Sequence, residues 1–491
     1  MRYDLAVIGG GTAGLVAALV AAGIGGRTVL VEADRTGGDC LWTGCVPSKS
    51  LIAAAGVAHA VDTAAAYGLG EIRRDPVDLG GVMDRIGRVQ AGIEPHDSVE
   101  RLRSEGVDVV MGRAEFVSDR ELSVGEEILR FRKALVATGS APVIPPIPGL
   151  GSGGVEPLTT DTVWSLRELP PRLLVVGGGA VGCELGQAFS RLGAEVTLVE
   201  MTPRLLGPFP ADAAEVIENV LGSEGVVVRT GLSVVRVEPG PGGGGGDVNG
   251  GTAVMSDGDR IPFDRILIAA GRRPRTWGLG LEAAGVEVGG NGAVTVDDRL
   301  RTSRRNIYAA GDVTGELPLT PVAAIHGRHV GQHAMLGVGR PASVDLLPRV
   351  VFTSPEVATV GRVGGAGDGD GGDGADISPR RIRFDHSELD RAMAAGQTWG
   401  FTEATVDGDG RVQGATVVGA RAGETIVGWR TAVESGAKVT SLAVPLAYPT
   451  WSEANTKVGE LALREHYDRP TLRVLGRMAV RAVRLVGMGR R

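Results

Sequence analysis

The chain has 491 residues, a formal net charge of −7 and 43% hydrophobic residues. This length predicts about three domains, and the apolar fraction supports large buried cores, which excludes a disordered or collagen-like protein. The acidic balance argues against a nucleic-acid-binding protein. Three cysteines are too few for a secreted disulfide framework. They favour a reducing, cytoplasmic environment, where closely spaced cysteines are more often catalytic than structural.

The chain begins with an uncharged run from Leu5 to Gly26, long enough to suggest a membrane span or a signal core. Three consecutive glycines divide this run into an aliphatic strand, Leu5–Ile8, and an apolar helix, Ala13–Ala22. The sequence therefore predicts the first strand and helix of a nucleotide-binding fold rather than a membrane segment.

The junction between this strand and helix has the spacing GxGxxG, with Gly9, Gly11 and Gly14. The first glycine permits a tight turn, the second lets the backbone approach a pyrophosphate, and the third lets the helix pack on the strand. The helix N-terminus then binds the anion. Glu32 closes the next strand 18 residues after the last glycine, where an acid can bind ribose hydroxyls.

The same pattern recurs with Gly177, Gly179 and Gly182, and Glu200 again follows after 18 residues. A single GxGxxG is a weak signal. Two copies, each with its strand, helix and acid, predict two dinucleotide sites.

Between the two patterns, the sequence predicts a helical stretch around Asp84–Glu105 and a strand that ends at Ala134–Ser140, before a proline-rich linker. A further strand-like piece, Asn306–Asp312, leads into a helix. That helix carries His326, His329 and His333, whose spacing could form a metal-binding face; we interpret these histidines as structural. From residue 349 onward, alternating strands and a helix indicate a separate α+β domain.

Two glycine-rich tracts, Pro239–Gly251 and Gly361–Gly374, each contain 8 glycines. They are typical of long loops. The second also resembles glycine–aspartate calcium-binding repeats, but those require tandem copies and this chain has one irregular copy. We interpret both tracts as loops.

Cys40 and Cys45 are separated by four residues and are followed by Pro47 and a helical run from about Ser48. Such a pair can close a small disulfide near a helix N-terminus, where the pKa of a thiol is lowered. A zinc half-site or two inert thiols are the alternatives. Zinc needs two further ligands, and no CxxC or paired histidines lie nearby in the sequence. The spacing therefore predicts a redox-active pair.

With these motifs in this order, the chain resembles the FAD-dependent pyridine nucleotide–disulfide oxidoreductases, which include dihydrolipoyl dehydrogenase, glutathione reductase and mercuric reductase. The resemblance covers nearly all of residues 1–465. It implies an α/β protein, with two Rossmann-like nucleotide-binding domains and a C-terminal α+β dimerisation domain, that works as a homodimer.

The resemblance also implies site residues. FAD would be held by Gly9, Gly11, Gly14, Glu32, Thr138, Gly139, Gly311 and Asp312, and the nicotinamide dinucleotide by Gly177, Gly179, Gly182 and Glu200. Cys45 would be the thiol beside the flavin and Cys40 the thiol facing the substrate. Lys49 would lie near the flavin, paired with Glu184. No metal site is implied.

The identity of the nicotinamide dinucleotide depends on Glu200. A carboxylate accepts hydrogen bonds from a ribose 2′-hydroxyl but repels a 2′-phosphate, which favours NADH. Arg204 could partly reverse this preference, so NADPH is the alternative.

The chain departs from the family near its end, where disulfide reductases carry His-Pro-Thr-x-x-Glu and the histidine is the acid/base for substrate thiols. Here Tyr448 replaces the histidine and Glu453 remains. A phenol with a pKa near 10 is a poor base at neutral pH, so efficient turnover of lipoamide is not expected. Tyrosine at this position resembles mercuric reductases, yet this chain has no C-terminal vicinal cysteines. Asp39, which replaces a threonine of the family, is either a turn residue or a charge that disfavours thiolate at Cys40.

Residues 469–491 contain seven arginines and no acidic residue, with apolar residues between them. This pattern predicts a basic amphipathic helix. It could attach to an anionic membrane surface. It could also pack on its own subunit with a solvated arginine face, or fray.

The sequence thus predicts an FAD-binding domain in two parts, 1–145 and 291–347, an NAD(P)-binding domain at 146–290, a dimerisation domain at 348–468 and the basic tail at 469–491. We expect a cytoplasmic NAD(P)H oxidoreductase that passes electrons through FAD and a Cys40–Cys45 disulfide to a small-molecule acceptor. The acceptor would be a disulfide or a metal ion. The alternative is a membrane-associated NADH:quinone reductase that does not require the cysteines.

Overall fold

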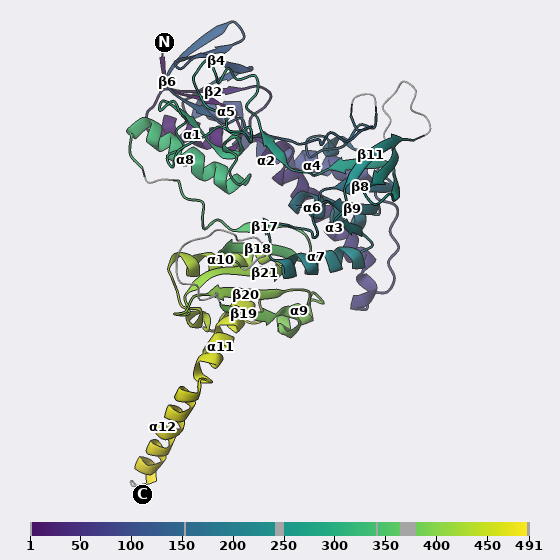
Figure 1. Ribbon diagram of the computed structural model, residues 1–491, viewed down its shortest axis with the longest axis vertical. Helices are drawn as coiled ribbons and strands as arrows, with labels where there is room; N and C mark the ends of the chain where they lie inside the picture. Colours follow the sequence, from purple (N-terminus) through teal and green to yellow (C-terminus); the bar gives the residue numbers. More distant parts are fainter. Residues whose placement is uncertain (1, 152–153, 241–249, 340–341, 364–379, 489–491) are drawn as a thin grey trace. The chain divides into compact units, whose positions relative to one another are not determined.

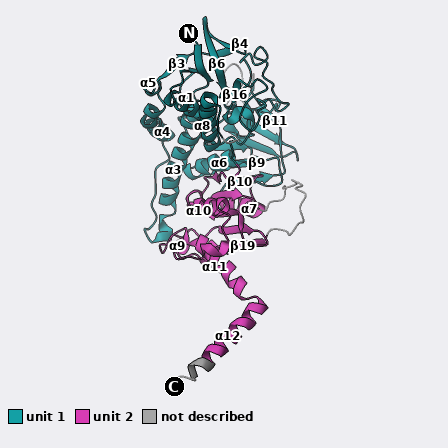
Figure 2. Ribbon diagram, turned by 90° about the vertical axis from the view of Figure 1, so that its left-hand side faces the viewer, with its two compact units in different colours: residues 1–205, 221–344 teal, residues 206–220, 345–491 magenta. Residues whose placement is uncertain are grey.

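The computed structural model describes every residue except 1, 152–153, 241–249, 340–341, 364–379 and 489–491. The two predicted glycine loops fall largely outside the described residues. The chain forms two compact units: the first contains residues 1–205 and 221–344, and the second contains residues 206–220 and 345–491 (Figure 2). The predicted division into five segments stays a prediction.

The largest sheet of the first unit has a parallel centre. Its middle strand, β1 (Arg2–Ile8), pairs in parallel with β2 and β6. The aliphatic residues Leu5–Ile8 are all buried, as is typical of a parallel strand in a sheet that is covered on both faces. The sheet continues antiparallel from β6 through β5 to β4. In spatial order the strands are β3 (Val107–Met111), β2 (Thr28–Glu32), β1, β6 (Glu127–Val136), β5 (Glu121–Val124) and β4 (Ala114–Ser118), with β16 (Ile307–Ala309) also parallel to β6.

Two helices far apart in the sequence pack closely in this unit, as Figure 1 shows: α1 (Thr12–Gly23) and α8 (Thr320–Leu336). Small residues make the approach possible. A Cβ at Gly327 would lie 2.4 Å from the carbonyl oxygen of Ala13, and one at Gly331 would lie 2.8 Å from that of Ala17. This packing places the start of α8 near the first glycine loop.

A second parallel sheet in this unit repeats the strand–helix arrangement. β8 (Arg172–Val176) leads into α6 (Ala180–Leu192), and α3 (Cys45–Asp62) packs against α6. The sheet order is β10 (Val227–Thr230), β9 (Glu195–Glu200), β8 and β14 (Arg265–Ile268). Smaller antiparallel sheets join β11 (Val234–Pro239), β12 (Gly251–Met255) and β13 (Arg260–Phe263), and join β15 (Arg272–Pro274) to β7 (Ser140–Pro142).

The second unit is built on an antiparallel sheet with two packed helices, α10 (Ala422–Glu434) and α11 (Glu453–Tyr467). The fully buried Trp429 of α10 donates a hydrogen bond to Asn455 of α11 at 2.7 Å. The strand order is β17 (Arg349–Val351), β18 (Glu356–Gly361), β21 (Val412–Gly419), β20 (Phe401–Val406) and β19 (Arg380–Asp385). The remaining α-helices of the two units together are α2 (Gly38–Trp42), α4 (Leu79–Ile93) and α5 (Val99–Ser104) in the first unit, α9 (Asp390–Ala394) and α12 (Pro470–Met488) in the second, and α7 (Ala211–Ser223), which is mostly in the second.

The α/β fold class is confirmed, and the uncharged run from Leu5 to Gly26 forms β1 and α1 as predicted. The predicted stretch around Asp84–Glu105 is helical, but it is not one continuous helix. It consists of α4 and α5, separated by a short 3-10 helix that contains Pro95. Proline lacks the N–H that a continuous helix needs. None of the helices among the described residues combines the length and apolar character needed to cross a membrane.

Candidate functional site

In the first glycine loop the first and last glycines of the motif have no room for a side chain, whereas the middle glycine does. Gly9 has φ +105°, and a Cβ there would lie 2.4 Å from the carbonyl oxygen of Ala137. A Cβ at Gly14 would lie 1.9 Å from the carbonyl oxygen of Gly9. At Gly11, in contrast, the nearest atom to a Cβ is 3.8 Å away. The backbone thus makes a tight turn and leaves free approach at its middle glycine, which fits a bound pyrophosphate.

The second loop repeats this geometry almost atom for atom. Gly177 has φ +114°, and a Cβ there would lie 2.4 Å from the oxygen of Ala269, while one at Gly182 would lie 1.8 Å from the oxygen of Gly177. A Cβ at Gly179 would meet no atom within 4 Å. Neither α1 nor α6 has a side chain capping its N-terminus or an acid in its first turn. Both helix ends can therefore receive an anion.

The two acids also occupy equivalent places. Glu32, at the end of β2, accepts a hydrogen bond from the backbone N–H of Gly10 at 2.5 Å. Glu200, at the end of β9, accepts one from the N–H of Gly178 at 2.6 Å and a second from Thr202. Each carboxylate is held against its own glycine loop, where a ribose would lie.

The ends of β6 and β16 bring the other predicted FAD residues to the same edge of the large sheet. The Thr138 hydroxyl donates to the carbonyl oxygen of Arg275 at 2.7 Å. Gly139 and Gly311 both have positive φ, near +70°. The Asp312 carboxylate accepts a hydrogen bond from Ser140 at 2.6 Å. These contacts fix the backbone around Asp312, so the described residues fit an extended dinucleotide such as FAD.

The two cysteines lie on consecutive helices as free thiols. Cys40 is half-buried in α2, and Cys45 is the exposed first residue of α3. The helix therefore begins at the cysteine itself, earlier than the predicted Ser48. The Cys45 sulfur lies 3.3 Å from the hydroxyl of Thr320 on α8. Thr320 was not predicted as a site residue from the sequence, although the proline that follows it is typical of a helix start.

The two cysteines differ in the pKa of their thiols, so that Cys40 stays protonated while Cys45 readily forms a thiolate. The hydrogen bond from the Cys40 thiol lowers the pKa of Cys45 to about 6, with further help from the Thr320 hydroxyl and the Lys49 cation. The same hydrogen bond, together with burial, raises the pKa of Cys40. At neutral pH the pair therefore keeps one proton on Cys40 and a negative charge on Cys45.

Lys49 and Glu184 meet, as the resemblance implied. The Lys49 ammonium on α3 lies 2.7 Å from the Glu184 carboxylate on α6, whose side chain is only 7% exposed. Lys49 is also one helical turn after Cys45, so the two share a helix face. The ion pair fixes the cation beside the thiolate.

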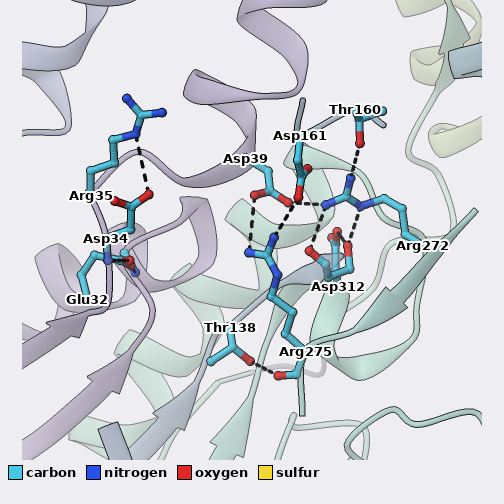
Figure 3. A network of polar contacts seen from close by, with 12 residues as sticks. Glu32, Asp34, Arg35, Asp39, Thr138, Thr160, Asp161, Arg272, Arg275 and Asp312 are labelled. Carbon is cyan, nitrogen blue, oxygen red and sulfur yellow. Dashed lines mark hydrogen bonds and ion pairs between the residues drawn. The ribbon is translucent and has the colours of Figure 1, made fainter. Parts of the chain in front are cut away.

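Asp39, the neighbour of Cys40, belongs to a network of charges rather than acting as an isolated anion (Figure 3). Its carboxylate pairs with Arg272 and lies 3.7 Å from Arg275. Arg272 also donates to Ser140 at 2.7 Å, and Arg275 lies 3.5 Å from Asp161. Two arginines thus compensate the charge of Asp39, and the expectation that it disfavours a Cys40 thiolate is not supported.

Tyr448 and Glu453 lie in the second unit and have separate partners. The Tyr448 hydroxyl donates a hydrogen bond to Asp390 at 2.6 Å, and this bond raises the pKa of Tyr448 above its ordinary value. Glu453 lies 3.7 Å from Lys457, and its other carboxylate oxygen is buried with no hydrogen-bond partner among the described residues. Asp390 lies 58 residues from Tyr448, and no sequence pattern pointed to this contact.

Two of the three histidines of α8 and the third cysteine have hydrogen-bond partners, while His329 stacks on the ring of His333. His326 accepts a hydrogen bond from the N–H of Gly311, and His333 bonds to the Tyr308 hydroxyl at 3.0 Å. Cys183 is buried and donates to the oxygen of Gly178. No cluster of metal-ligating side chains occurs among the residues that the structure describes.

The comparisons with known proteins agree with this geometry. Residues 3–327 match the family described as pyridine nucleotide-disulphide oxidoreductase, and residues 347–458 match the dimerisation domain of the same family. The chain belongs to this family. Its members use FAD and NAD(P)H, so this chain is an FAD-dependent NAD(P)H oxidoreductase, and the dimerisation domain supports a homodimer.

Relatives within the family differ in their acceptors. The chain is 35% identical to a mercuric reductase of Streptomyces lividans, covering 90% of this chain and 92% of the relative. It is 36% identical to a dihydrolipoyl dehydrogenase of Thermus scotoductus, covering 93% and 97%. Among solved structures, a Cu(II) complex of the HOCl-induced flavoprotein disulfide reductase RclA of Escherichia coli has a TM-score of 0.79 at 27% identity, covering 94% and 99%.

Proposed function

We propose that the chain oxidises NADH and passes the electron pair through the Cys40–Cys45 disulfide to a small-molecule disulfide in the cytosol. The observation that carries this proposal is the division of the cysteine pair, in which Cys45 has a pKa of about 6 while Cys40 retains its proton. A dithiol that exchanges with an external disulfide needs these two different thiols.

In this proposal the residues keep the roles implied by the family resemblance. FAD, when bound, accepts the electron pair of NADH and delivers it to the cysteine disulfide. FAD would contact Gly9, Gly11, Gly14, Glu32, Thr138, Gly139, Gly311 and Asp312, and NADH would contact Gly177, Gly179, Gly182 and Glu200. The carboxylate of Glu200 supports NADH over NADPH because it would repel a 2′-phosphate.

The exchange itself is the work of the two cysteines. Cys40 transfers its proton through the hydrogen bond to Cys45, attacks one sulfur of the acceptor disulfide and releases one acceptor thiolate, which takes up a proton. Cys45 then attacks the Cys40 sulfur of the mixed disulfide, and its proton passes to the departing acceptor sulfur. This second attack restores the Cys40–Cys45 disulfide and releases the second acceptor thiol. The Lys49 cation stabilises the Cys45 thiolate in the reduced state.

A soft metal ion is the second candidate acceptor, and the contact between Tyr448 and Asp390 favours it. The Tyr448 proton is donated to Asp390, so its oxygen presents lone pairs rather than a proton to a ligand. A phenol with a raised pKa is a poor base for substrate thiols. The similarity to a mercuric reductase and to a Cu(II) complex of RclA also supports this candidate.

The test is NADH oxidation by the purified flavoprotein with lipoamide, with thiol-bound Hg(II) and with a soluble quinone. We expect Cys40→Ser to reduce turnover of lipoamide or Hg(II) at least about 100-fold, because the attacking sulfur is lost. Cys183→Ser is the matched control, since Cys183 lies on α6 outside the pair and a serine hydroxyl can keep its hydrogen bond to the oxygen of Gly178, so this variant should retain activity.

Quinone is included because it tests the alternative function, an NADH:quinone reductase that does not require the cysteines. The comparisons do not support that alternative. Turnover of quinone that survives Cys40→Ser, with lipoamide and Hg(II) both inert, would contradict the proposal. Activity with Hg(II) but not lipoamide would select the metal ion.

A further inference from the structure

Helix α12 (Pro470–Met488) is the most exposed helix of the second unit (Figure 1, yellow). It follows α11 and extends away from the sheet of this unit. From Pro470 to Arg484 every described side chain is exposed except that of Leu472, which is half-buried. The exposed set includes large apolar side chains: Val474, Leu475, Met478, Val480 and Val483 are 48–71% exposed. The described part of the helix has no tertiary core of its own.

The helix separates apolar from basic residues around its axis. Successive residues of an α-helix turn by about 100°. On this basis Leu475, Met478 and Ala482 lie on one side, flanked by Leu472, Ala479 and Val483. The arginines Arg473, Arg477, Arg481 and Arg484 lie on the other side. Val474 and Val480 are the exceptions, because they lie beside the arginines. Both sides face solvent in the folded chain, so the apolar side is uncovered.

The basic side has little compensation from the protein. Arg473 forms an ion pair with Asp468 at 2.8 Å, just before the helix. Among the described residues no carboxylate pairs with Arg477, Arg481 or Arg484, and the sequence has no acid after Asp468. The remaining cations are available to an external anionic surface.

We propose that α12 docks the protein on an anionic lipid bilayer, with the apolar side embedded at the interface and the arginines at the headgroups. A helix with this division of residues lies in the plane of the interface. A second copy of the chain fits less well, because it would cover the apolar side and leave the arginines without anions, whereas an anionic bilayer meets both sides of the helix. This proposal goes beyond the redox function and does not depend on it.

The test is co-sedimentation of the full-length holoenzyme with phosphatidylcholine vesicles that contain or lack phosphatidylglycerol. Binding should require the anionic lipid and weaken as salt is raised. The double substitution Arg477→Gln and Arg481→Gln should lower partitioning at least about tenfold, given roughly fivefold per cation near such a surface.

A matched pair of substitutions tests the orientation of the helix. Leu475→Gln, on the apolar side, should weaken binding about tenfold, because a buried leucine is lost. Val480→Gln, on the same helix but among the arginines, should change it less than about twofold. All variants should retain NADH oxidation with a soluble acceptor.

Three results would overturn the proposal. One is failure of the wild-type protein to sediment with anionic vesicles. Another is equal loss of binding in Leu475→Gln and Val480→Gln. The third is a change of oligomeric mass in Leu475→Gln without vesicle binding, which would assign α12 to contacts between copies of the chain.

Discussion

The two glycine loops have nearly the same backbone but different surroundings. Gly14 and Gly182 leave equally little room for a Cβ, and Glu32 and Glu200 hydrogen-bond their own loops in the same way. Only the first loop is followed by a cysteine pair, which begins eight residues after Glu32. The two loops therefore have the same local backbone geometry, whereas the cysteine pair follows only the first of them.

We expect the strongest loss of cofactor binding when a side chain is added to one glycine loop at a time. Gly14→Ala should destabilise the protein by about 1–3 kcal/mol and abolish retention of flavin, because the new Cβ would overlap the oxygen of Gly9. Gly182→Ala should leave the flavin bound but prevent its reduction by NADH. Visible absorbance and denaturant unfolding measure the first result, and anaerobic stopped-flow reduction measures the second.

Gly23→Ala is the control for this experiment, since a Cβ at Gly23, also on α1, would meet no atom within 4 Å. Its flavin content should match that of the wild type. A Gly14→Ala protein that stays yellow and reacts normally would show that the first loop does not hold FAD.

A smaller effect should distinguish the two acids. Glu200→Gln keeps a hydrogen-bond acceptor but removes the negative charge, so the ratio of kcat/KM for NADPH to that for NADH should rise about tenfold. Glu32→Gln should leave this ratio unchanged, because FAD has no 2′-phosphate. An unchanged ratio in Glu200→Gln would remove Glu200 from coenzyme selection.

A weaker effect is expected on the pH dependence of the Cys45 thiolate, which follows the first loop in the sequence. Because the pKa of Cys45 is lowered to about 6, its alkylation by iodoacetamide should rise as pH increases through that value and then level off. Lys49→Met should move this rise to higher pH and slow alkylation near pH 6.5 by about threefold to tenfold.

The control for Lys49→Met is Lys457→Met, which removes a lysine that pairs with Glu460 on α11. It should not alter the alkylation profile. If Lys49→Met leaves the profile in place as well, the hydrogen bonds from Cys40 and Thr320 suffice to stabilise the thiolate.

Features that depend on neighbouring residues could be predicted from the sequence alone. The two glycine loops, their acids and the cysteine spacing could be predicted because each is set by backbone sterics and hydrogen bonds within about 30 residues. The α/β fold class followed from the same strand and helix patterns. The interruption of the predicted helix at Pro95 is likewise local, and the sequence could have shown it.

Contacts between side chains that are far apart in the sequence became known from the folded structure. Thr320 reaches Cys45 across 275 residues, and Arg272 reaches Asp39 across 233, so neither pairing has a local signal. Lys49 and Glu184 were paired by family resemblance rather than by their spacing. Asp39 shows the consequence: its charge was visible in the sequence, but its two arginines depend on how β15 packs beside α2. The electrostatic state of a site depends on long-range packing, which local sequence patterns do not encode.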